Sequence, residues 1–588
     1  MSRRAIAFGL AVLLVCALGL LAADRVARST RAPAPTPPIA ASAHDAPRTA
    51  TPQPTATSTT PPSATPTATA TPTPTPRPLR LAVDQPTYAR FRDALQGLPA
   101  LCPGWAIVPY PAPYDAERLL ADGLAEAALA WAADPPPGGA PLRVEPYVAA
   151  FHVTHPEREV SLERLAELAS GEAPGLALVV APGGRDVVRD LLGVEPLDAL
   201  ELADWESAKE YVATHPDAWA LLPWEAVDFR VRALPVDGVR PDPHRPDGDP
   251  LARRLWLRAA PVDVAPLAEA LAVALRFEPP PVVELVAVGD VMLGRTVGRL
   301  IAGDTPRYPY EGEGVLPILQ GADVTIGNLE CPVSDRGQPV AKTYTFRADP
   351  GVVEGLVWAG FDVLSLANNH LGDYGLDAVR DTLRHLAEAG LAVTGAGETA
   401  DAAHAARIVE AGGLRLAFLA FNQVPPESFA ADDERPGLAW MDPERMTAAV
   451  RAAREVADLV IVSCHWGIEY SAHPTPSQER IAQALADAGA DLIIGHHPHV
   501  VQGVQYHAET FTAYSLGNYV FDIDLTAESL QGAMLRCLLD PTGVKTVEIV
   551  PVSIDDCRPV VMPSDRAESV LRRMERVTRE RSWLPAKR

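Results

Sequence analysis

The sequence predicts an α/β protein with two folded regions behind an exported amino terminus. Short apolar runs typical of strands alternate with segments of helical periodicity from residue 79 onward, which is the pattern of an α/β layer fold. The chain has 588 residues, and a single hydrophobic core rarely serves more than about 300 residues, so two domains are expected. The run Pro279-Pro280-Pro281 marks the boundary between them.

The composition excludes several classes of protein. Apolar residues make up 47% of the chain and charged residues 21%, which is enough to form real cores and excludes global disorder. The net charge of −24, without a basic patch in the sequence, excludes a general nucleic-acid binder. The six cysteines form no CxxC pair, which excludes a zinc ribbon and a disulfide-dense scaffold.

The first 78 residues predict a membrane anchor and a tether. Two arginines precede the apolar run 5–23, whose 19 residues would span about 28 Å as a helix, close to the thickness of a bilayer core. We favour an uncleaved anchor over residues 1–23, with the arginines in the cytoplasm, over the alternative of a cleaved signal peptide. From about residue 31 to residue 78 the chain is nearly all Pro, Thr, Ala and Ser, which predicts a disordered, extended linker over residues 24–78.

The first folded region is expected over residues 79–280, as a smaller α/β domain. Its predicted elements are strands at Leu79–Val83, Trp105–Pro109 and Val144–Val153, and helices at Tyr88–Leu98, at Ala116–Leu129 and after the cap residue Ser161. The strand Val144–Val153, the helix Ser161–Gly171 and the run Leu234–Gly238 resemble type 2 periplasmic phosphate-binding proteins. Where those proteins hold an anion with Gly, Ser and Thr, this chain has Asp84-Gln85-Pro86-Thr87. A ligand-binding domain and a spacer or interaction domain both remain open.

The second folded region, residues 283–560, carries a repeated pattern of polar residues after apolar strands. The strands are Val283–Val288, Val324–Ile326, Val363–Ala367, Leu459–Ser463 and Leu492–Ile494, and the residues that follow them include Asp290, Glu330, Asn369, His465, His497 and His499. Parallel strands in one sheet would bring these side chains to one edge. Each alone is typical of a turn, a helix cap or a structural imidazole. Together they predict a site for Mn, Fe or Zn, because carboxylate, amide and imidazole ligands suit those ions.

Several motifs of this region resemble the CapA family of capsule synthesis proteins, which is linked to poly-γ-glutamate and is similar to calcineurin-like metallophosphoesterases. The matching motifs are Gly289–Arg295, Gly327–Glu330, Asn368–His370 with Asp373–Gly375, His465–Gly467, Gly495–His499 and Ser515–Asn518. The resemblance implies a four-layer α/β/β/α sandwich and two divalent metal ions.

The resemblance also implies roles for individual residues. Asp290 and His499 would hold one ion, Asn369, His465 and His497 would hold the other, and Glu330 would bridge them. His370 would protonate the leaving group or steady developing charge. A histidine usually stands two residues after the first Asp in phosphoesterases, but this chain has Met292, a poor ligand for a hard ion. The role of His496 is open.

Arg295 and Arg347 are candidates for binding an anionic substrate, although ordinary surface arginines explain them equally well. Residues 561–588 predict a charged helical tail that packs on the second region.

Two functions are consistent with the sequence. The first is a membrane-anchored bacterial hydrolase or transferase, with the bulk of its chain outside the cytoplasm, that acts on an anionic surface polymer such as poly-γ-glutamate or on a phosphorylated precursor. The second is a non-catalytic export or assembly factor in which the metal site is vestigial. The membrane and other capsule-synthesis membrane proteins are the expected partners, and nucleic acid is not.

Overall fold

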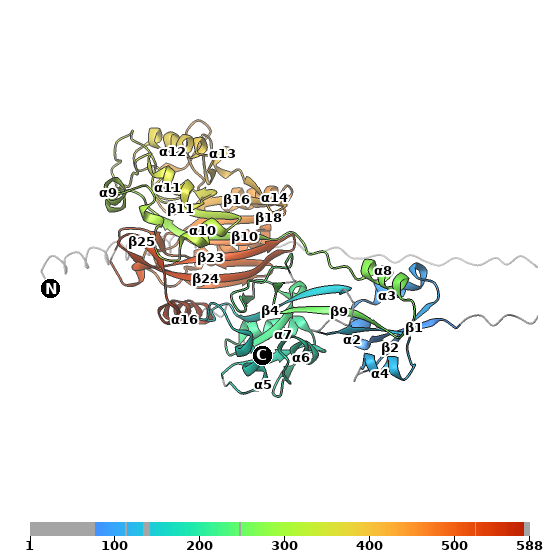
Figure 1. Cartoon of the computed structure of the whole chain (residues 1–588). Helices are drawn as coiled ribbons and strands as arrows, with labels where there is room; N and C mark the ends of the chain where they lie inside the picture. Colours follow the sequence, from blue (N-terminus) through green and yellow to red (C-terminus); the bar gives the residue numbers. More distant parts are fainter. Residues whose placement is uncertain are drawn as a thin grey trace, which may run out of the picture. The chain divides into compact units, whose positions relative to one another are not determined.

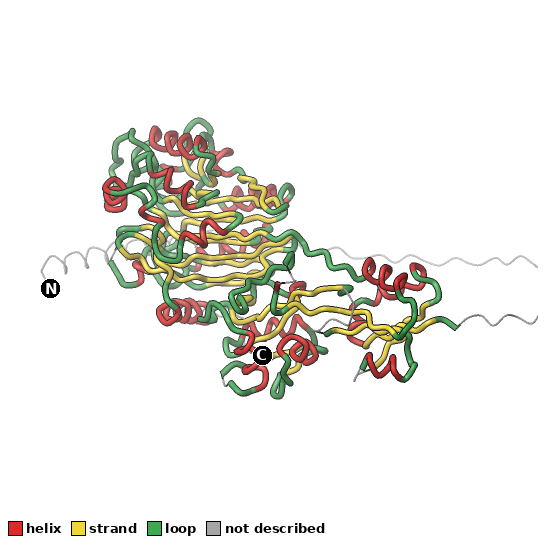
Figure 2. The backbone as a smooth tube through the Cα atoms, viewed as in Figure 1, coloured by secondary structure: helices red, strands yellow, loops and turns green. Residues whose placement is uncertain are grey.

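A computed structural model describes residues 77–111, 115–132, 141–173, 175–245, 248–523 and 525–580. It is a mixed α/β protein with several sheets, and Figure 2 shows strands throughout the described part of the chain. The predicted anchor, most of the predicted linker and the last eight residues lie outside the described residues. None of the described helices is both long enough and apolar enough to cross a bilayer.

The first region forms one sheet with the strand order β2-β1-β3-β9-β4-β7-β5-β6, and β8 pairs with β4. Its strands are β1 (Leu79–Asp84), β2 (Trp105–Tyr110), β3 (Ala127–Trp131), β4 (Arg143–His152), β5 (Ala177–Val180), β6 (Leu200–Glu201), β7 (Ala218–Pro223), β8 (Val231–Leu234) and β9 (Ala252–Ala259). Its helices are α2 (Gln85–Arg90), α3 (Arg92–Leu101), α4 (Ala116–Ala121), α5 (Leu162–Ser170), α6 (Gly184–Leu192), α7 (Trp205–Thr214) and α8 (Ala265–Ala274), with a 3₁₀ turn η1 (Trp224–Ala226).

Two helix predictions of this region are corrected and one is confirmed. The helix predicted over Ala116–Leu129 stops at Ala121, because Gly123 takes a positive φ of 63° and the apolar run that follows becomes β3. The helix predicted over Tyr88–Leu98 is divided at Phe91 into α2 and α3. Ser161 caps α5 as predicted, since its hydroxyl accepts a hydrogen bond from the Arg164 N–H.

The second region contains two large sheets. The eight-stranded sheet has the order β13-β12-β11-β10-β23-β24-β25 with β22 beside β10, and the six-stranded sheet has the order β15-β16-β18-β19-β21-β20. The bounds are β10 (Val283–Val291), β11 (Val324–Leu329), β12 (Val363–Ser365), β13 (Ala392–Thr394), β14 (Ala396–Gly397), β15 (Arg407–Ala411), β16 (Leu414–Asn422), β17 (Gly437–Leu438), β18 (Leu459–His465), β19 (Leu492–His496), β20 (Val504–His507), β21 (Thr510–Ala513), β22 (Asn518–Val520), β23 (Gln531–Asp540), β24 (Gly543–Asp555) and β25 (Arg558–Val561).

Helices cover both large sheets. They are α9 (Arg295–Gly303), α10 (Leu316–Gly321), α11 (Val352–Ala359), α12 (Leu376–Glu388), α13 (Ala400–His404), α14 (Pro443–Arg454), α15 (Pro476–Ala488) and α16 (Ser564–Glu580), with 3₁₀ turns η3 (Tyr308–Tyr310), η4 (Glu427–Phe429) and η5 (Glu528–Leu530). One apolar cluster joins α9–α12 to the eight-stranded sheet, and another joins α13–α15 to the six-stranded sheet. A third lies between the two sheets and includes apolar residues of α16.

The alternation of side chains along β10 explains how one strand serves two cores. Leu285 and Ala287 pack in the cluster between the sheets, whereas Val286 and Val288 pack under the helices. β10, β23 and β24 lie side by side in Figure 1, with β23 antiparallel to both neighbours.

The expectation that the five ligand-bearing strands share one sheet is wrong, because β10–β12 belong to one sheet and β18 and β19 to the other.

Candidate metal centre

The ends of strands from both sheets meet at one buried group of polar side chains. Asp290 lies in β10, Glu330 follows β11, and Asn369 follows β12, while His465 ends β18 and His496 ends β19. Side chains of the two sheets contact each other directly, since His465 Nε2 lies 2.9 Å from Asn369 Oδ1 and 3.7 Å from Glu330 Oε1. The structure therefore brings together the six predicted metal ligands, Asp290, Glu330, Asn369, His465, His497 and His499.

Asp290 is fully buried and receives hydrogen bonds from several directions. Asn328 Nδ2 donates to its Oδ1 at 2.9 Å, and the backbone N–H of His497 donates to its Oδ2 at 3.3 Å. His496 Nδ1 lies 3.1 Å from Oδ1, and His499 Nδ1 lies 3.3 Å from Oδ2. Burial alone would raise the pKa of Asp290, but the imidazoles of His496 and His499 hold that pKa well below its usual value. Asp290 is therefore an anion in this site.

Glu330 differs from Asp290 because no donor in the described part of the chain bonds to it. Among these residues, both of its carboxylate oxygens are buried without a hydrogen-bond partner, and so is His497 Nδ1. Nitrogens of His370, His465 and His499 surround Glu330 Oε1 at 4.0, 3.7 and 3.9 Å. Those separations are too long for hydrogen bonds and leave room for an ion between the ligands.

A buried triad could hold that ion. One ligand atom from each of Glu330, His497 and His499 lies within 4.8 Å of the other two, and all three residues are buried. Burying an unpaired carboxylate costs several kcal/mol unless a cation compensates it. The donor set of one carboxylate and two imidazoles suits Mn, Fe or Zn. The residues present therefore fit a divalent metal ion.

The pKa values of the clustered side chains point the same way. Burial raises the pKa of Glu330 well above 4.5, and the charge of Asp290 adds to this effect. Burial lowers the pKa of His497 to about 3 and the pKa of His465 well below its usual value. Burial would also lower the pKa of His499, but the charges of Glu330 and Asp290 raise it to about 10. Glu330 and His499 thus both tend to hold a proton, which offsets the buried negative charge of the cluster. A divalent cation bound there would offset the same charge.

His370 is held at the edge of this group by a second set of contacts. Its Nδ1 lies 2.6 Å from Asp373 Oδ2, its ring stacks on Phe346 at 3.9 Å, and its Nε2 faces Glu330 Oε1. Lys342 Nζ donates to Asp373 Oδ1 at 2.9 Å and to the Asn369 carbonyl at 2.5 Å. Burial lowers the pKa of His370 to about 4 even though Asp373 opposes this shift. His370 is therefore neutral at pH 7, with its proton on Nδ1 donated to Asp373 Oδ2 and a free lone pair on Nε2.

Comparison with known proteins identifies the family. Residues 284–523 match the family described as bacterial capsule synthesis protein PGA_cap. The chain is 36% identical over 280 residues to the capsule biosynthesis protein CapA of Bacillus anthracis, which covers 46% of this chain and 67% of that protein. It is 35% identical over 283 residues to the PGA biosynthesis protein CapA of Bacillus subtilis (strain 168), over 47% of this chain and 73% of that protein. The chain belongs to the CapA family.

Part of this CapA family member is also similar to solved structures. A phosphate transport receptor of Vibrio cholerae aligns with 34% of this chain and 94% of its own, with a TM-score of 0.29 and 16% sequence identity. A putative phosphate transporter substrate-binding protein of Clostridium perfringens aligns with 34% of this chain and 93% of its own, with a TM-score of 0.27 and 13% identity.

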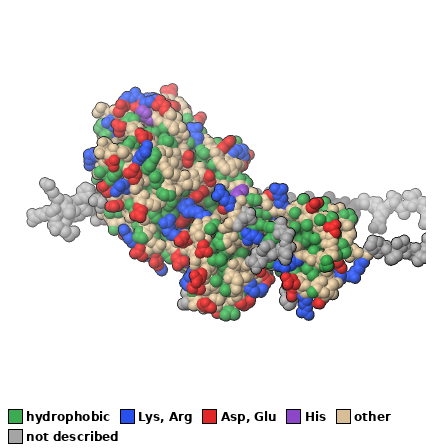
Figure 3. All heavy atoms as spheres, in the orientation of Figure 1, with side chains coloured by type: hydrophobic (Ala, Val, Ile, Leu, Met, Phe, Trp, Pro, Cys, Tyr) green, Lys and Arg blue, Asp and Glu red, His purple; other side chains and the backbone are tan. Residues whose placement is uncertain are grey.

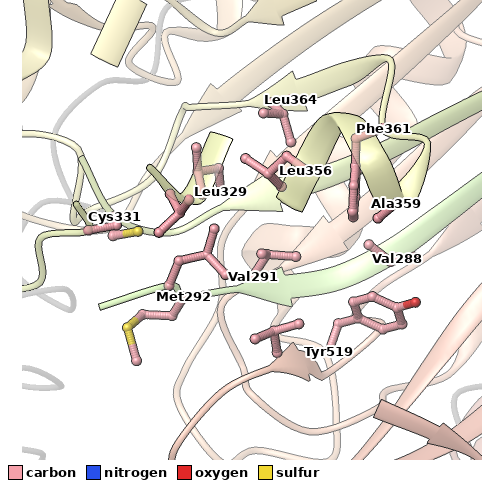
Figure 4. Close-up of a cluster of buried hydrophobic side chains, with 14 of the residues drawn as sticks. Val288, Val291, Met292, Leu329, Cys331, Leu356, Ala359, Phe361, Leu364 and Tyr519 are labelled. Carbon is pink, nitrogen blue, oxygen red and sulfur yellow. The ribbon is translucent and has the colours of Figure 1, made fainter. Parts of the chain in front are cut away.

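Met292 does not contribute a ligand atom to the centre of this CapA protein. It is fully buried in the apolar cluster that includes Val291, Leu329 and Cys331, as Figure 4 shows. Its sulfur accepts a hydrogen bond from the Gly294 N–H at 3.2 Å. The Met292 side chain is therefore part of the apolar core of the second region.

The two candidate substrate arginines of this CapA protein already have partners. Arg295 Nε lies 3.3 Å from Asp522 Oδ2, and its guanidinium lies 5.2 Å from the centre of the Phe346 ring. Phe346 stacks on His370, so Arg295 stands next to the centre. Arg347 donates to the Arg336 carbonyl at 3.0 Å and lies over the Tyr374 ring. Among the residues that the structure describes, these contacts of Arg347 are made away from the predicted metal ligands.

His497 and His499 were placed after a strand by the sequence, and other residues were missed. β19 ends at His496, and both histidines adopt positive φ values, of 93° and 56°. A left-handed turn after the strand directs them to the site. Lys342 was missed because it lies in a loop without a motif signal. Asp373 belongs to one of the motifs that resemble the CapA family, but the resemblance gave it no role.

Proposed function

We propose that this chain is a metal-dependent hydrolase or transferase of capsule or poly-γ-glutamate synthesis. In this proposal the amino terminus anchors the chain in the bacterial membrane and the folded regions work outside the cytoplasm. The second region is proposed to be a metallophosphoesterase-like sandwich that carries the active site. Its substrate is an anionic polymer such as poly-γ-glutamate, or a phosphorylated precursor.

The observation that carries the proposal is the orphaned carboxylate of Glu330. It is fully buried, accepts no hydrogen bond, and has imidazole nitrogens around it at 3.7–4.0 Å. Buried polar groups are nearly always paired in folded proteins, so an unpaired carboxylate facing three histidines is best explained by an ion. The proposal assigns two ions, with Asp290 and His499 on one side, Asn369, His465 and His497 on the other, and Glu330 between them.

The chemistry requires both the ions and His370. When bound, divalent ions would supply Lewis-acid polarisation of a phosphoryl or carbonyl oxygen. His370 donates a hydrogen bond from Nδ1 to Asp373, so its Nε2 atom carries no proton and faces the centre. This Nε2 can take a proton from the attacking group. The same Nε2 can then return that proton to the leaving group. Burial of the ring excludes water from this transfer.

The choice of substrate is supported by the relatives. The names of the two Bacillus relatives describe capsule biosynthesis and PGA biosynthesis. A Mycobacterium tuberculosis relative, 30% identical over 290 residues that cover 42% of this chain and 76% of that protein, is called a probable polyglutamine synthesis accessory protein. A carboxylate-rich polymer would need cationic groups near the centre, and Arg295 beside Phe346 provides one.

The proposal is tested on the full-length chain, purified in detergent and loaded with Mn²⁺. Cleavage of poly-γ-glutamate is followed by gel filtration, and hydrolysis of p-nitrophenyl phosphate is followed by absorbance. We expect turnover of at least one substrate, and we expect His370→Ala to lower that turnover about 100-fold while the ion content stays unchanged. His507→Ala is the matched control, since His507 is buried but bonds to Gln483 instead of the centre.

A non-catalytic assembly or export factor is the second candidate function. It is favoured by the buried Met292, which stands where phosphoesterases usually carry a histidine ligand. The same experiment separates the two. A metal-loaded chain that binds poly-γ-glutamate but turns over neither substrate contradicts the hydrolase proposal and supports this second one.

A further inference from the structure

We propose that His496 is a metal ligand, which joins Asp290 and His499 on one side of the centre. The inference rests on the proposed metal function and deepens it, because it gives a role to a side chain that the sequence left without one. It is argued from the backbone register, from the distance between His496 and Asp290, and from the donors that Asp290 already has.

The register of two parallel strands directs His496 to the site. β18 pairs with β19 in parallel, and the last paired residues are His465 and His496. Side chains of paired residues in a parallel sheet point to the same face. Since His465 contacts Asn369 at the centre, His496 faces the centre as well. The preceding Gly495 faces the other way, where an added Cβ would lie 1.9 Å from the Tyr514 carbonyl oxygen.

The distance between His496 and Asp290 suits two ligands of one ion. His496 Nδ1 lies 3.1 Å from Asp290 Oδ1, and both residues are almost fully buried. Nitrogen and oxygen ligands bind Zn or similar ions at about 2.0–2.2 Å, so two ligands at right angles around one ion are about 3 Å apart. The pair therefore has the spacing of neighbouring positions around one ion.

Asp290 does not need His496 as a hydrogen-bond donor. Asn328 Nδ2 already donates to Oδ1 at 2.9 Å, and the His497 N–H donates to Oδ2 at 3.3 Å. Each carboxylate oxygen is thus satisfied without an imidazole. A carboxylate can accept about four hydrogen bonds, so the 3.1 Å contact of His496 Nδ1 with Oδ1 fits a donor as well as a ligand, but the pairing of Asp290 does not depend on it. Meanwhile His499 Nδ1 has Asn518 Oδ1 at 2.9 Å, which orients its ring and leaves Nε2 free to bind an ion.

The test counts ions and nitrogen ligands, not turnover. The full-length chain is stripped with a chelator and titrated with Mn²⁺, and bound ions are counted by mass spectrometry after gel filtration. We expect His496→Ala to lose one ion per chain or to weaken one Mn²⁺ site at least tenfold. Pulsed electron paramagnetic resonance of the Mn²⁺-loaded chain should show fewer coupled imidazole nitrogens in this variant.

Two further variants make the outcome decisive. His496→Gln keeps an amide that can donate to Asp290 but ligates ions poorly, so we expect it to behave like His496→Ala. His507→Gln, a buried histidine away from the centre, should bind Mn²⁺ like the wild type. Unchanged binding in His496→Ala, or full rescue by His496→Gln, overturns the proposal and leaves the metal function standing. A wild-type chain that binds no Mn²⁺ overturns the proposed function as well.

Discussion

At the scale of single residues, Asp373 organises the proton chemistry of the candidate site. Its two oxygens accept from Lys342 Nζ at 2.9 Å, from the Phe346 N–H at 2.8 Å and from His370 Nδ1 at 2.6 Å. The ammonium of Lys342 also lies 3.1 Å from His370 Nδ1. Lys342 thus orients the carboxylate of Asp373, and Asp373 in turn orients the imidazole of His370. Lys342 is therefore a positioning residue.

Replacing Lys342 tests that role. We expect Lys342→Met to lower the turnover of the metal-loaded chain about tenfold and to shift its pH profile, because Asp373 loses the cation that orients it. Lys342→Arg should recover part of the turnover. The ion content, measured by mass spectrometry, should remain that of the wild type in both variants. Equal loss of ions and turnover would show instead that Lys342 only maintains the fold of the site.

A second residue-scale prediction concerns stability and pH. Asp249 Oδ1 accepts from the Leu251 N–H at 2.8 Å, but its buried Oδ2 has no hydrogen-bond partner among the residues that the structure describes. Burial raises the pKa of this carboxyl from 3.8 to about 6. The folded protein then holds a proton that the unfolded chain releases, so the contribution of Asp249 to stability falls as pH rises from about 4 to 6.

Asp249→Asn should remove that decline. The amide oxygen can still accept from Leu251, and the neutral NH₂ replaces the unpaired oxygen. We expect the variant to be more stable than the wild type at pH 7, by up to roughly 3 kcal/mol, and nearly equal at pH 3.5. Urea unfolding at the two pH values measures the difference. A stability gain that is the same at both values would exclude ionisation of Asp249 as its cause.

At the scale of elements, the sequence predicted strands and helix caps correctly, but it did not predict a turn or the assignment of strands to sheets. β1, β2, β4 and α5 were predicted within a few residues, because uninterrupted apolar runs and a Ser cap are local signals. The turn at Gly123 and the assignment of strands to two sheets were missed, because both depend on packing between distant segments. The strand ends still located the site, since ligand positions follow the strands in either arrangement.

Close packing of β10 gives a prediction at this scale. A Cβ added at Gly289 would lie 2.1 Å from the Gly517 carbonyl oxygen, so the strand and the 516–518 segment approach too closely for any other residue. We expect Gly289→Ala to destabilise the protein by about 2–3 kcal/mol and to weaken metal binding, because Asp290 must move.

Gly303→Ala is the matched control for this prediction. Gly303 ends α9, has no atom within 4 Å of an added Cβ, and should accept alanine with a change in unfolding free energy below about 1 kcal/mol. Thermal unfolding and ion content of the two variants give the comparison. Similar behaviour of both glycine variants would contradict the packing argument.

At the scale of the whole molecule, the CapA match covers the second region, and the first region has its own sheet. The two regions touch where β8 lies beside β24: the Ala233 N–H donates to Thr546 Oγ1 at 3.1 Å, and the buried Arg232 lies 3.2 Å from Glu548. On the face shown in Figure 3, acidic and basic side chains are interspersed.

The sequence predicted those site residues that stand directly after a strand, but not those whose place depends on packing. Asp290, Glu330, Asn369 and His465 could be named because each stands directly after an apolar run. His496 could not be given a role, because its direction depends on the register between β18 and β19. Lys342 lies more than twenty residues from the motif that it supports, and only the folded loop brings it to Asp373.

The central claim is that the buried cluster around Glu330 holds a divalent cation, and direct counting of ions tests it. The full-length chain, purified without chelator and analysed by mass spectrometry for Mn, Fe and Zn, should contain at least one ion per chain. A double variant, Glu330→Gln with His497→Gln, should lose that ion while it keeps its circular dichroism spectrum. A wild-type chain that carries well below one ion per molecule, even after incubation with Mn²⁺, would contradict the account.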